Sequence, residues 1–130
     1  MGMFDWYNPI PSISCPVCKK QLAGWQGKAG PNALFLWKQG YTSPVDQLVD
    51  DEIKISAEER AQFHLPDEFE FYTYECDCKR RIVAIGRCTN GTWNESQLMT
   101  PDNARPYGHE SQHEFRARVQ DLAKWLSNAR

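Results

Sequence analysis

The sequence predicts an α+β fold built on a small antiparallel sheet. Residues 69–78 alternate between two faces with a period of two, as in a half-buried strand. Residues 82–85 are apolar on both faces, as in a central strand of the same hairpin. Near the C-terminus, apolar residues recur about one helical turn apart and predict an amphipathic helix. A short helix near residue 60 completes the predicted elements.

The N-terminal half begins with a segment rich in proline and aromatic residues, which predicts an extended arm packed on the body of the protein. The apolar run 33–37 predicts a buried strand, and the alternating piece 53–55 predicts an edge strand. Ser56 and Glu59 have the spacing of a capping box, so we expect a short helix to begin there and to reach about residue 63.

The central hairpin follows. Its first strand places Phe69, Phe71 and Thr73 on one face. The dipeptide Asn90-Gly91 marks a tight turn, after which Thr92 and Trp93 begin a return strand. These signals predict three consecutive antiparallel strands.

A proline-rich loop at 101–108 separates the hairpin from the last helix. Ser111 and Glu114 form a second capping box that predicts the start of this helix. Its apolar stripe is predicted to pack on the sheet. The stripe consists of Phe115, Val119, Leu122 and Leu126, with Trp125 beside it.

Four cysteines form two close pairs, Cys15 with Cys18 and Cys76 with Cys78. Each pair can offer two thiolates from one turn, and two such turns complete the tetrahedral sulfur site that Zn²⁺ favours. The second pair has one intervening residue where the usual zinc knuckle has two, and neither pair is followed by glycine. Two alternatives remain open: Cys88 replaces one of the four ligands, or some of these cysteines are ordinary buried residues. The sequence predicts a zinc-ribbon-like cysteine clamp holding one structural zinc ion.

Size and charge restrict the possible classes of protein. With 130 residues we expect one domain spanning 1–130, and the formal charge of −2 gives no general attraction to nucleic acid or anionic membranes. No apolar run approaches the roughly 20 residues of a membrane span. The N-terminal run also lacks the basic and apolar parts of a secretory signal. We therefore expect a cytoplasmic protein with reduced thiols.

A possible catalytic motif lies before the last helix, where His109, Glu110 and His113 fit the pattern H-E-x-x-H of zinc hydrolases. That motif requires a helix already running through its first histidine, whereas Gly108 and the Ser111 cap place the helix start at or after His109. A metallohydrolase is therefore a remote alternative, and we expect the protein not to be an enzyme.

Five basic residues follow the cysteine pairs and would converge if both pairs bound one ion. They would offset the negative charge of a four-thiolate zinc site. They could equally contact phosphates, so a nucleic-acid-binding zinc ribbon is the main alternative function. The five are Lys19, Lys20, Lys79, Arg80 and Arg81.

The opening run Met1-Gly-Met-Phe-Asp5, followed by Cys15-Pro-Val-Cys18 and a later cysteine pair, resembles a loose group of small bacterial and phage proteins of zinc-ribbon-like character. Small single-domain proteins of this build are also similar to immunity proteins, which neutralise antibacterial toxins. The resemblance implies a cognate toxin as protein partner. Acidic stretches suit the occlusion of a basic toxin surface. The candidate partner-binding residues are Asp50, Asp51, Glu52, Asp67, Glu68 and Glu70.

Overall fold

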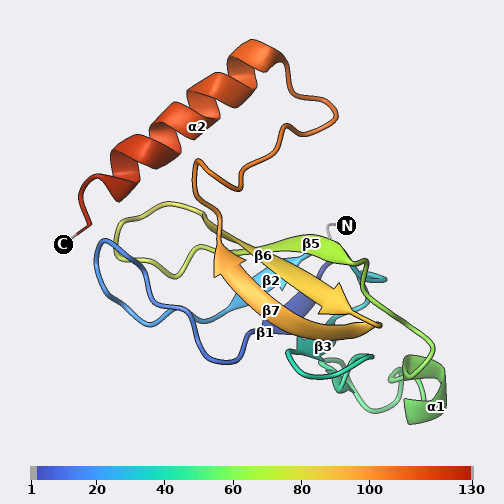
Figure 1. The fold of residues 1–130 in the computed structure, drawn as a ribbon. Helices are drawn as coiled ribbons and strands as arrows, with labels where there is room; N and C mark the ends of the chain where they lie inside the picture. Colours follow the sequence, from blue (N-terminus) through green and yellow to red (C-terminus); the bar gives the residue numbers. More distant parts are fainter. Residues whose placement is uncertain (1–2, 130) are drawn as a thin grey trace.

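In the computed structural model, which describes residues 3–129, seven strands form one curled sheet in the order β4-β3-β1-β2-β5-β6-β7 (Figure 1). The pair β1–β3 is parallel and the other neighbours are antiparallel. The fold is α+β as predicted, but the sheet is larger than expected and is mixed. The strands are β1 (Asp5–Asn8), β2 (Trp25–Gly27), β3 (Phe35–Lys38), β4 (Asp46–Gln47), β5 (Glu68–Thr73), β6 (Ile82–Thr89) and β7 (Thr92–Leu98). The helices of the described chain are α1 (Ala57–Arg60) and α2 (Gln112–Leu126).

The predicted N-terminal arm is in fact a strand inside the sheet. In β1, Tyr7 pairs with Trp25 of β2, while Trp6 pairs with Leu36 of β3. Asp5 and Tyr7 point into the core and are almost fully buried. The arm was underestimated because its partners lie far along the chain and one of its two buried residues is charged.

The first half of the sheet confirms one predicted strand and corrects another. The apolar run 33–37 supplies β3, as predicted. Residues 53–55 do not form the predicted edge strand, and Ile53 is 67% exposed. The edge is β4 instead, and buried Gln47 uses its side chain to accept from the Ile55 amide at 2.9 Å and to donate to the Ala33 carbonyl at 3.0 Å.

The central hairpin agrees with its prediction except at the end of its first strand, because β5 ends at Thr73 and residues 74–78 belong to the turn and not to the strand. Phe69, Phe71 and Thr73 are buried on one face of β5, which pairs with β6 in antiparallel register. Asn90 and Gly91 have φ angles of 53° and 82°. Positive φ at both residues is what a two-residue type I′ turn between β6 and β7 requires. These strands therefore follow from local sequence alone.

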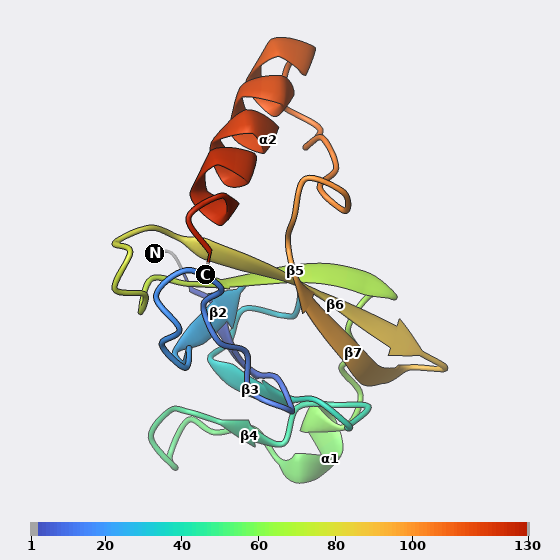
Figure 2. The same cartoon turned by 60° about the vertical axis from the view of Figure 1, so that its left-hand side comes forward.

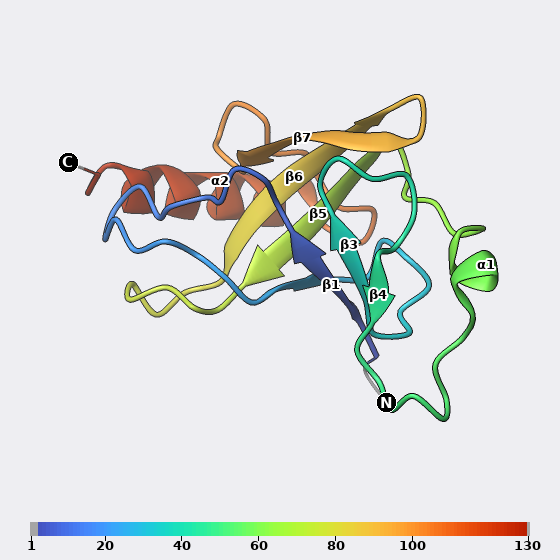
Figure 3. The same cartoon turned by 90° about the horizontal axis from the view of Figure 1, so that it is seen from below.

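The sheet curls until its far edge meets the segment after β3 (Figure 3). The Gly40 amide donates to the Trp93 carbonyl of β7 at 2.6 Å, and the Ser96 hydroxyl donates to the Gln39 side chain at 2.8 Å. This curl encloses an aromatic core. Its largest members are Tyr7, Trp25, Phe35, Trp37, Phe69, Phe71 and Trp93.

Helix α2 stands away from most of the sheet on its outer side (Figures 1 and 2). Its predicted capping box is present, with Ser111 accepting from the Glu114 amide and Glu114 accepting from the Ser111 amide. The expected stripe packs only in part: Leu122 is buried against Ile85 and Met99, whereas Phe115 and Val119 remain half-exposed. Neither helix of the described chain is long and apolar enough to cross a membrane.

Candidate metal centre and surrounding surfaces

Two loops bring four cysteines together. The loop between β1 and β2 carries Cys15 and Cys18, and the turn between β5 and β6 carries Cys76 and Cys78. All four sulfur atoms lie within 4.8 Å of one another. The Cys15–Cys76, Cys18–Cys76 and Cys15–Cys78 sulfurs are separated by 3.4, 3.6 and 3.8 Å. Tetrahedral bonds of about 2.3 Å to one ion would place sulfurs about 3.8 Å apart, so the cluster is compatible with a single metal ion.

The first turn presents its sulfurs through the backbone. The Cys15 carbonyl accepts from the Lys19 amide at 3.0 Å, which closes the turn. The amides of Val17 and Cys18 both lie 3.4 Å from the Cys15 sulfur. Lys19 has φ 67°, the left-handed conformation that glycine adopts most easily. The turn therefore forms without the usual glycine.

The second turn has the same design with one residue fewer. The Cys76 carbonyl accepts from the Lys79 amide at 3.0 Å, and the Cys78 amide lies 3.4 Å from the Cys76 sulfur. Lys79 has φ 56°, so a lysine again occupies the left-handed position after the pair. The short spacing of this pair is accommodated by a tighter turn.

The four thiols do not share one environment. Cys15 and Cys76 are buried, and burial raises the pKa of the Cys76 thiol. Hydrogen bonding from the Lys20 backbone is the main cause that lowers the pKa of Cys18 to about 6, with further contributions from Cys15 and Cys76. Cys18 is thus the thiol best prepared to act as a thiolate, and thiolates are the form in which cysteine binds metals.

Cys88 lies apart from the cluster. It stands in β6 opposite Trp93 of β7 and is outside the compact group of sulfurs. Burial, followed by the charge of Asp67, raises the pKa of its thiol. The alternative in which Cys88 replaces one of the four ligands does not fit this position.

The five basic residues surround the cluster, but four of them already have partners. Lys19 donates to a backbone carbonyl, Lys20 and Arg80 pair with carboxylates, and Arg80 and Arg81 stack on aromatic rings. Within the described residues, the side chain of exposed Lys79 makes none of these contacts. The contacts are Lys19 to the Pro16 carbonyl at 2.8 Å, Lys20 to Asp77 at 3.5 Å, Arg80 to Asp121 at 3.0 Å and to the Trp125 ring at 4.6 Å, and Arg81 to the Tyr72 ring at 5.4 Å.

The H-E-x-x-H pattern does not form a helical metal site. Helix α2 begins at Gln112, so His109 and Glu110 precede it, as the Ser111 cap predicted. Glu110 accepts from Arg118 at 2.8 and 3.0 Å, and His109 stacks on Tyr107. Among the described residues, the four cysteines are the only group of histidine, cysteine and acidic side chains close enough together for one metal ion.

The two acidic stretches differ in their surroundings. Asp50, Asp51 and Glu52 lie exposed in the loop after β4. In the second stretch, Glu68 pairs with two arginines, and Glu70 accepts from the Tyr107 hydroxyl at 2.8 Å. The second stretch is therefore largely used within the protein, and Asp67 is its most open member.

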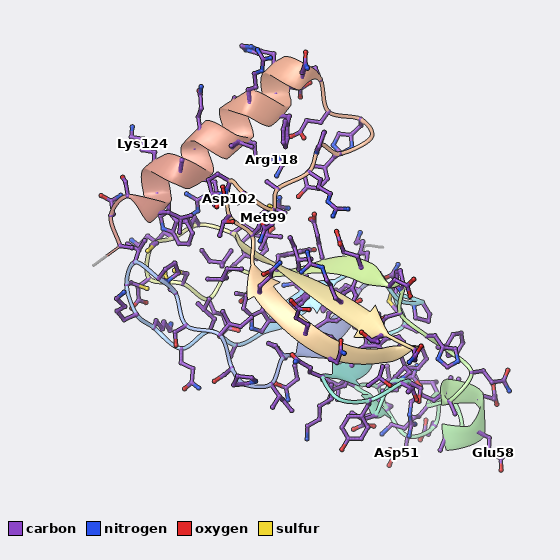
Figure 4. All side chains as sticks on the ribbon, in the orientation of Figure 1. Asp51, Glu58, Met99, Asp102, Arg118 and Lys124 are labelled. Atoms are coloured by element: carbon purple, nitrogen blue, oxygen red, sulfur yellow. The ribbon has the colours of Figure 1, made fainter. Side chains whose placement is uncertain are left out.

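Sequence reasoning missed that the first acidic stretch is part of a larger surface. We call this surface the acidic edge, and Figure 4 shows two of its members, Asp51 and Glu58, at the same end of the molecule. Its acids come from β4, the following loop and α1, and all of them lie within the segment 46–59. The acidic edge consists of Asp46, Asp50, Asp51, Glu52, Glu58 and Glu59.

Comparison of the chain with models of protein families, with curated proteins and with solved structures finds no match.

Proposed function

We propose that this protein is a non-enzymatic protein-binding module, most concretely an immunity protein that occludes a cognate toxin, with one structural zinc ion that fixes its shape. The acidic edge is the proposed contact surface, and a basic protein surface is the chemistry that complements it. The observation that carries the proposal is the pairing of this charge with exposed apolar side chains, because specific interfaces combine an apolar centre with a polar rim.

The apolar part of the acidic edge consists of Leu48 and Ile53, which are 47% and 67% exposed. Lys54 is the single basic residue in the segment 46–59, and it is already paired with Asp46 at 3.1 Å and Asp51 at 3.7 Å. The surface therefore has an excess of negative charge around two apolar anchors. Such a surface would steer a basic partner and then bury Ile53 at the contact.

Zinc is the proposed metal because Zn²⁺ binds thiolates well and is commonly held by four of them in a tetrahedral structural site. Four protein ligands leave no coordination position for substrate, so the ion would be structural. Cys15 and Cys18 would hold it from the loop before β2, and Cys76 and Cys78 from the β5–β6 turn. The ion would then join two segments that are far apart in sequence.

The metal is tested by elemental analysis of the purified protein, for which we expect about one zinc per chain. Cys76→Ser should abolish stoichiometric zinc and lower the free energy of unfolding by at least about 3 kcal/mol. Cys88→Ser is the matched control and should keep the zinc. A metal-free preparation as stable as the zinc-loaded protein would refute a structural ion.

The partner is tested by co-expression with the toxin encoded next to this chain's gene. We expect rescue of growth and co-purification, and the double variant Asp50→Lys with Asp51→Lys should lose both. The control carries the same charge change at exposed positions outside both acidic stretches, Glu75→Lys with Asp102→Lys, and should still rescue. Equal behaviour of the two double variants would rule out the acidic edge as the contact surface.

A second candidate, a nucleic-acid-binding zinc ribbon, is favoured by one observation. Exposed Arg81 lies over the ring of Tyr72, which forms an edge-to-face pair with Tyr74, and exposed Lys79 is two residues away in the chain. Cations next to aromatic rings suit a single strand. Titration of labelled DNA and RNA at low salt with the Lys79→Glu, Arg81→Glu variant tests it: unchanged binding, or none with the unaltered protein, would exclude this function.

A further inference from the structure

A cavity of about 390 Å³ lies between α2 and the outer face of the hairpin. Its apolar lining comes from β6, from the end of β7 and from one side of α2, and includes Val83, Leu98, Leu122 and Trp125. Figure 4 shows Arg118 on the helix side and Met99 on the sheet side, and the Arg118 Nη1 lies 3.4 Å from the Met99 sulfur. A volume of this size falls in the range of small-molecule sites, about 300 to 1,000 Å³.

The charged residues that line the cavity are three arginines and one aspartate: Arg80, Arg81, Arg118 and Asp121. Each nitrogen of the Arg118 guanidinium has a partner: Nε and Nη2 donate to Glu110, Nη2 also donates to the Arg105 carbonyl, and Nη1 lies against the Met99 sulfur. Arg80 is different, because only its Nη2 has a partner, Asp121 at 3.0 Å. The lining therefore has an excess of positive charge, and Arg80 keeps unused donors.

Two buried nitrogen atoms in this lining have no acceptor: Nε of Arg80 and Nε1 of Trp125. The two side chains lie together, with the guanidinium 4.6 Å from the centre of the Trp125 ring. Leaving a buried N–H without an acceptor costs about 1 to 3 kcal/mol, and such orphans are uncommon in folded proteins. Both atoms are buried beneath the cavity surface, so they represent unused donor capacity of Arg80 and Trp125 that an acceptor reaches when either side chain turns.

We propose that this cavity binds a small organic anion with an apolar body. The anionic group meets the Arg80 guanidinium, where it takes the place that Asp121 now partly fills, and Trp125 turns its buried indole N–H toward it. The apolar body lies over Val83, Leu98 and Leu122. A carboxylate, sulfonate or phosphate head group shares the required chemistry, because each offers several acceptor oxygens to a guanidinium. This inference does not depend on the proposed partner at the acidic edge, which lies at the other end of the molecule (Figure 2).

The test is a fluorescence titration of the full, zinc-loaded chain with 1-anilinonaphthalene-8-sulfonate, an aromatic sulfonate. We expect one saturable site per chain, displaced by octanoate and not by equimolar octanol. Arg80→Gln should weaken binding at least about tenfold through loss of the charged donor. Asp121→Asn should instead strengthen it several-fold, because it removes the carboxylate that competes for Arg80.

Opposite shifts are the decisive result, since both substitutions break the same Arg80–Asp121 pair and differ only in which charge they remove. Val83→Phe, on β6, should fill the cavity and abolish binding, whereas Val119→Phe, on α2 but outside the cavity, should leave binding unchanged. Near-ultraviolet circular dichroism verifies that each variant is folded. If Arg80→Gln fails to fold, Asp121→Asn and Val83→Phe still test whether the anion binds in this cavity. Shifts in the same direction, insensitivity to Val83→Phe or displacement by octanol would overturn the proposal.

Discussion

Asp5 is a charged residue at the centre of an aromatic core. Its carboxylate is fully buried and accepts from the amides of Asn32, Ala33 and Phe35 and from the indole N–H of Trp37, at 2.9 to 3.2 Å. No basic side chain pairs with it in the described chain. Four hydrogen bonds thus offset its desolvation, and Asp5 fixes the loop that leads into β3.

Asp5→Ala should lower the free energy of unfolding by at least about 3 kcal/mol, because it leaves several buried donors without an acceptor. Asp5→Asn keeps one acceptor oxygen but points an NH₂ group at the remaining donors, so it should also destabilise the protein, by a smaller amount. Urea unfolding measures both, and Asp51→Ala, at an exposed acid, is the control. A loss below about 1 kcal/mol for Asp5→Ala would contradict this role.

Lys19 and Lys79 occupy left-handed positions where the usual zinc knuckle has glycine, and a side chain there costs about 1 to 2 kcal/mol. Glycine relieves this strain but adds freedom to the unfolded chain, which offsets about half of the gain. Lys79→Gly should therefore leave the protein, with its proposed zinc ion bound, as stable as before or more stable by up to about 1 kcal/mol. Lys20→Gly, at a position without positive φ, should destabilise it. Denaturant unfolding measures the free energy of unfolding of both variants. A larger loss for Lys79→Gly than for Lys20→Gly would contradict the prediction.

Among the elements, those specified by neighbours in sequence were predictable. The hairpin β5–β6–β7 has alternating burial, an apolar central strand and an Asn-Gly turn, and each signal lies within a few residues of the structure it determines. Strand β1 depends on pairing with β2 and β3, and β4 is only Asp46–Gln47, without any apolar signal. Residues 53–55 have the right alternation for a strand but no partner, because the Gln47 side chain takes the Ile55 amide.

The candidate metal site was predictable for a similar reason. In a close cysteine pair, the short turn between the two residues itself sets the relative position of their sulfurs. The four ligand candidates could therefore be identified without knowing where their loops lie: Cys15, Cys18, Cys76 and Cys78. The acidic edge and the cavity under α2 could not be found in this way. The acids of the edge lie within the segment 46–59, but the sequence did not show which of them share a surface. The cavity residues come from separate elements, which the partial docking of α2 brings together.

At the N-terminal end of α2, Glu110 and Arg118 form a pair that ties the helix to the loop before it. Hydrogen bonding from Arg118 lowers the pKa of Glu110 to about 2, and the Glu110 side chain is only 8% exposed. A carboxyl whose folded pKa is depressed stabilises the protein above its unfolded value, near 4.5, and this contribution is lost as the pH falls toward 2.

Glu110→Gln should therefore destabilise the protein at pH 7, and its difference from the unaltered protein should shrink as the pH falls from about 5 to 2. Urea unfolding of both proteins at several pH values measures this difference in the free energy of unfolding. Any effect of acid on the cysteine cluster is the same in both proteins and cancels in the difference. Glu114→Gln, at the exposed capping box of the same helix, is the comparison. A difference that does not change over this pH range would show that Glu110 acts by packing and not by charge.

For the whole molecule, the cysteine cluster is a junction of three segments. It joins the loop before β2 to the β5–β6 turn, and the end of α2 lies beside it. Ser127 and Asn128 share a hollow with Val17 and Cys18. Arg80, two residues beyond Cys78, also pairs with Asp121 on the helix. The aromatic residues of the core come from the strands β1, β2, β3, β5 and β7, whereas the four cysteines, which pack against the same cluster, lie in loops outside these strands.

Removal of the metal should therefore loosen the junction before it unfolds the sheet. In hydrogen exchange after chelation, we expect faster exchange at residues 13–22, at 74–81 and in the last two turns of α2. Amides of β1 and β3 should keep most of their protection. The Cys76→Ser variant should reproduce the pattern without a chelator, and Cys88→Ser should not. Simultaneous loss of protection in every strand would mean that the metal is required for folding. Unchanged exchange in α2 would mean that Arg80 holds the helix independently of the cluster.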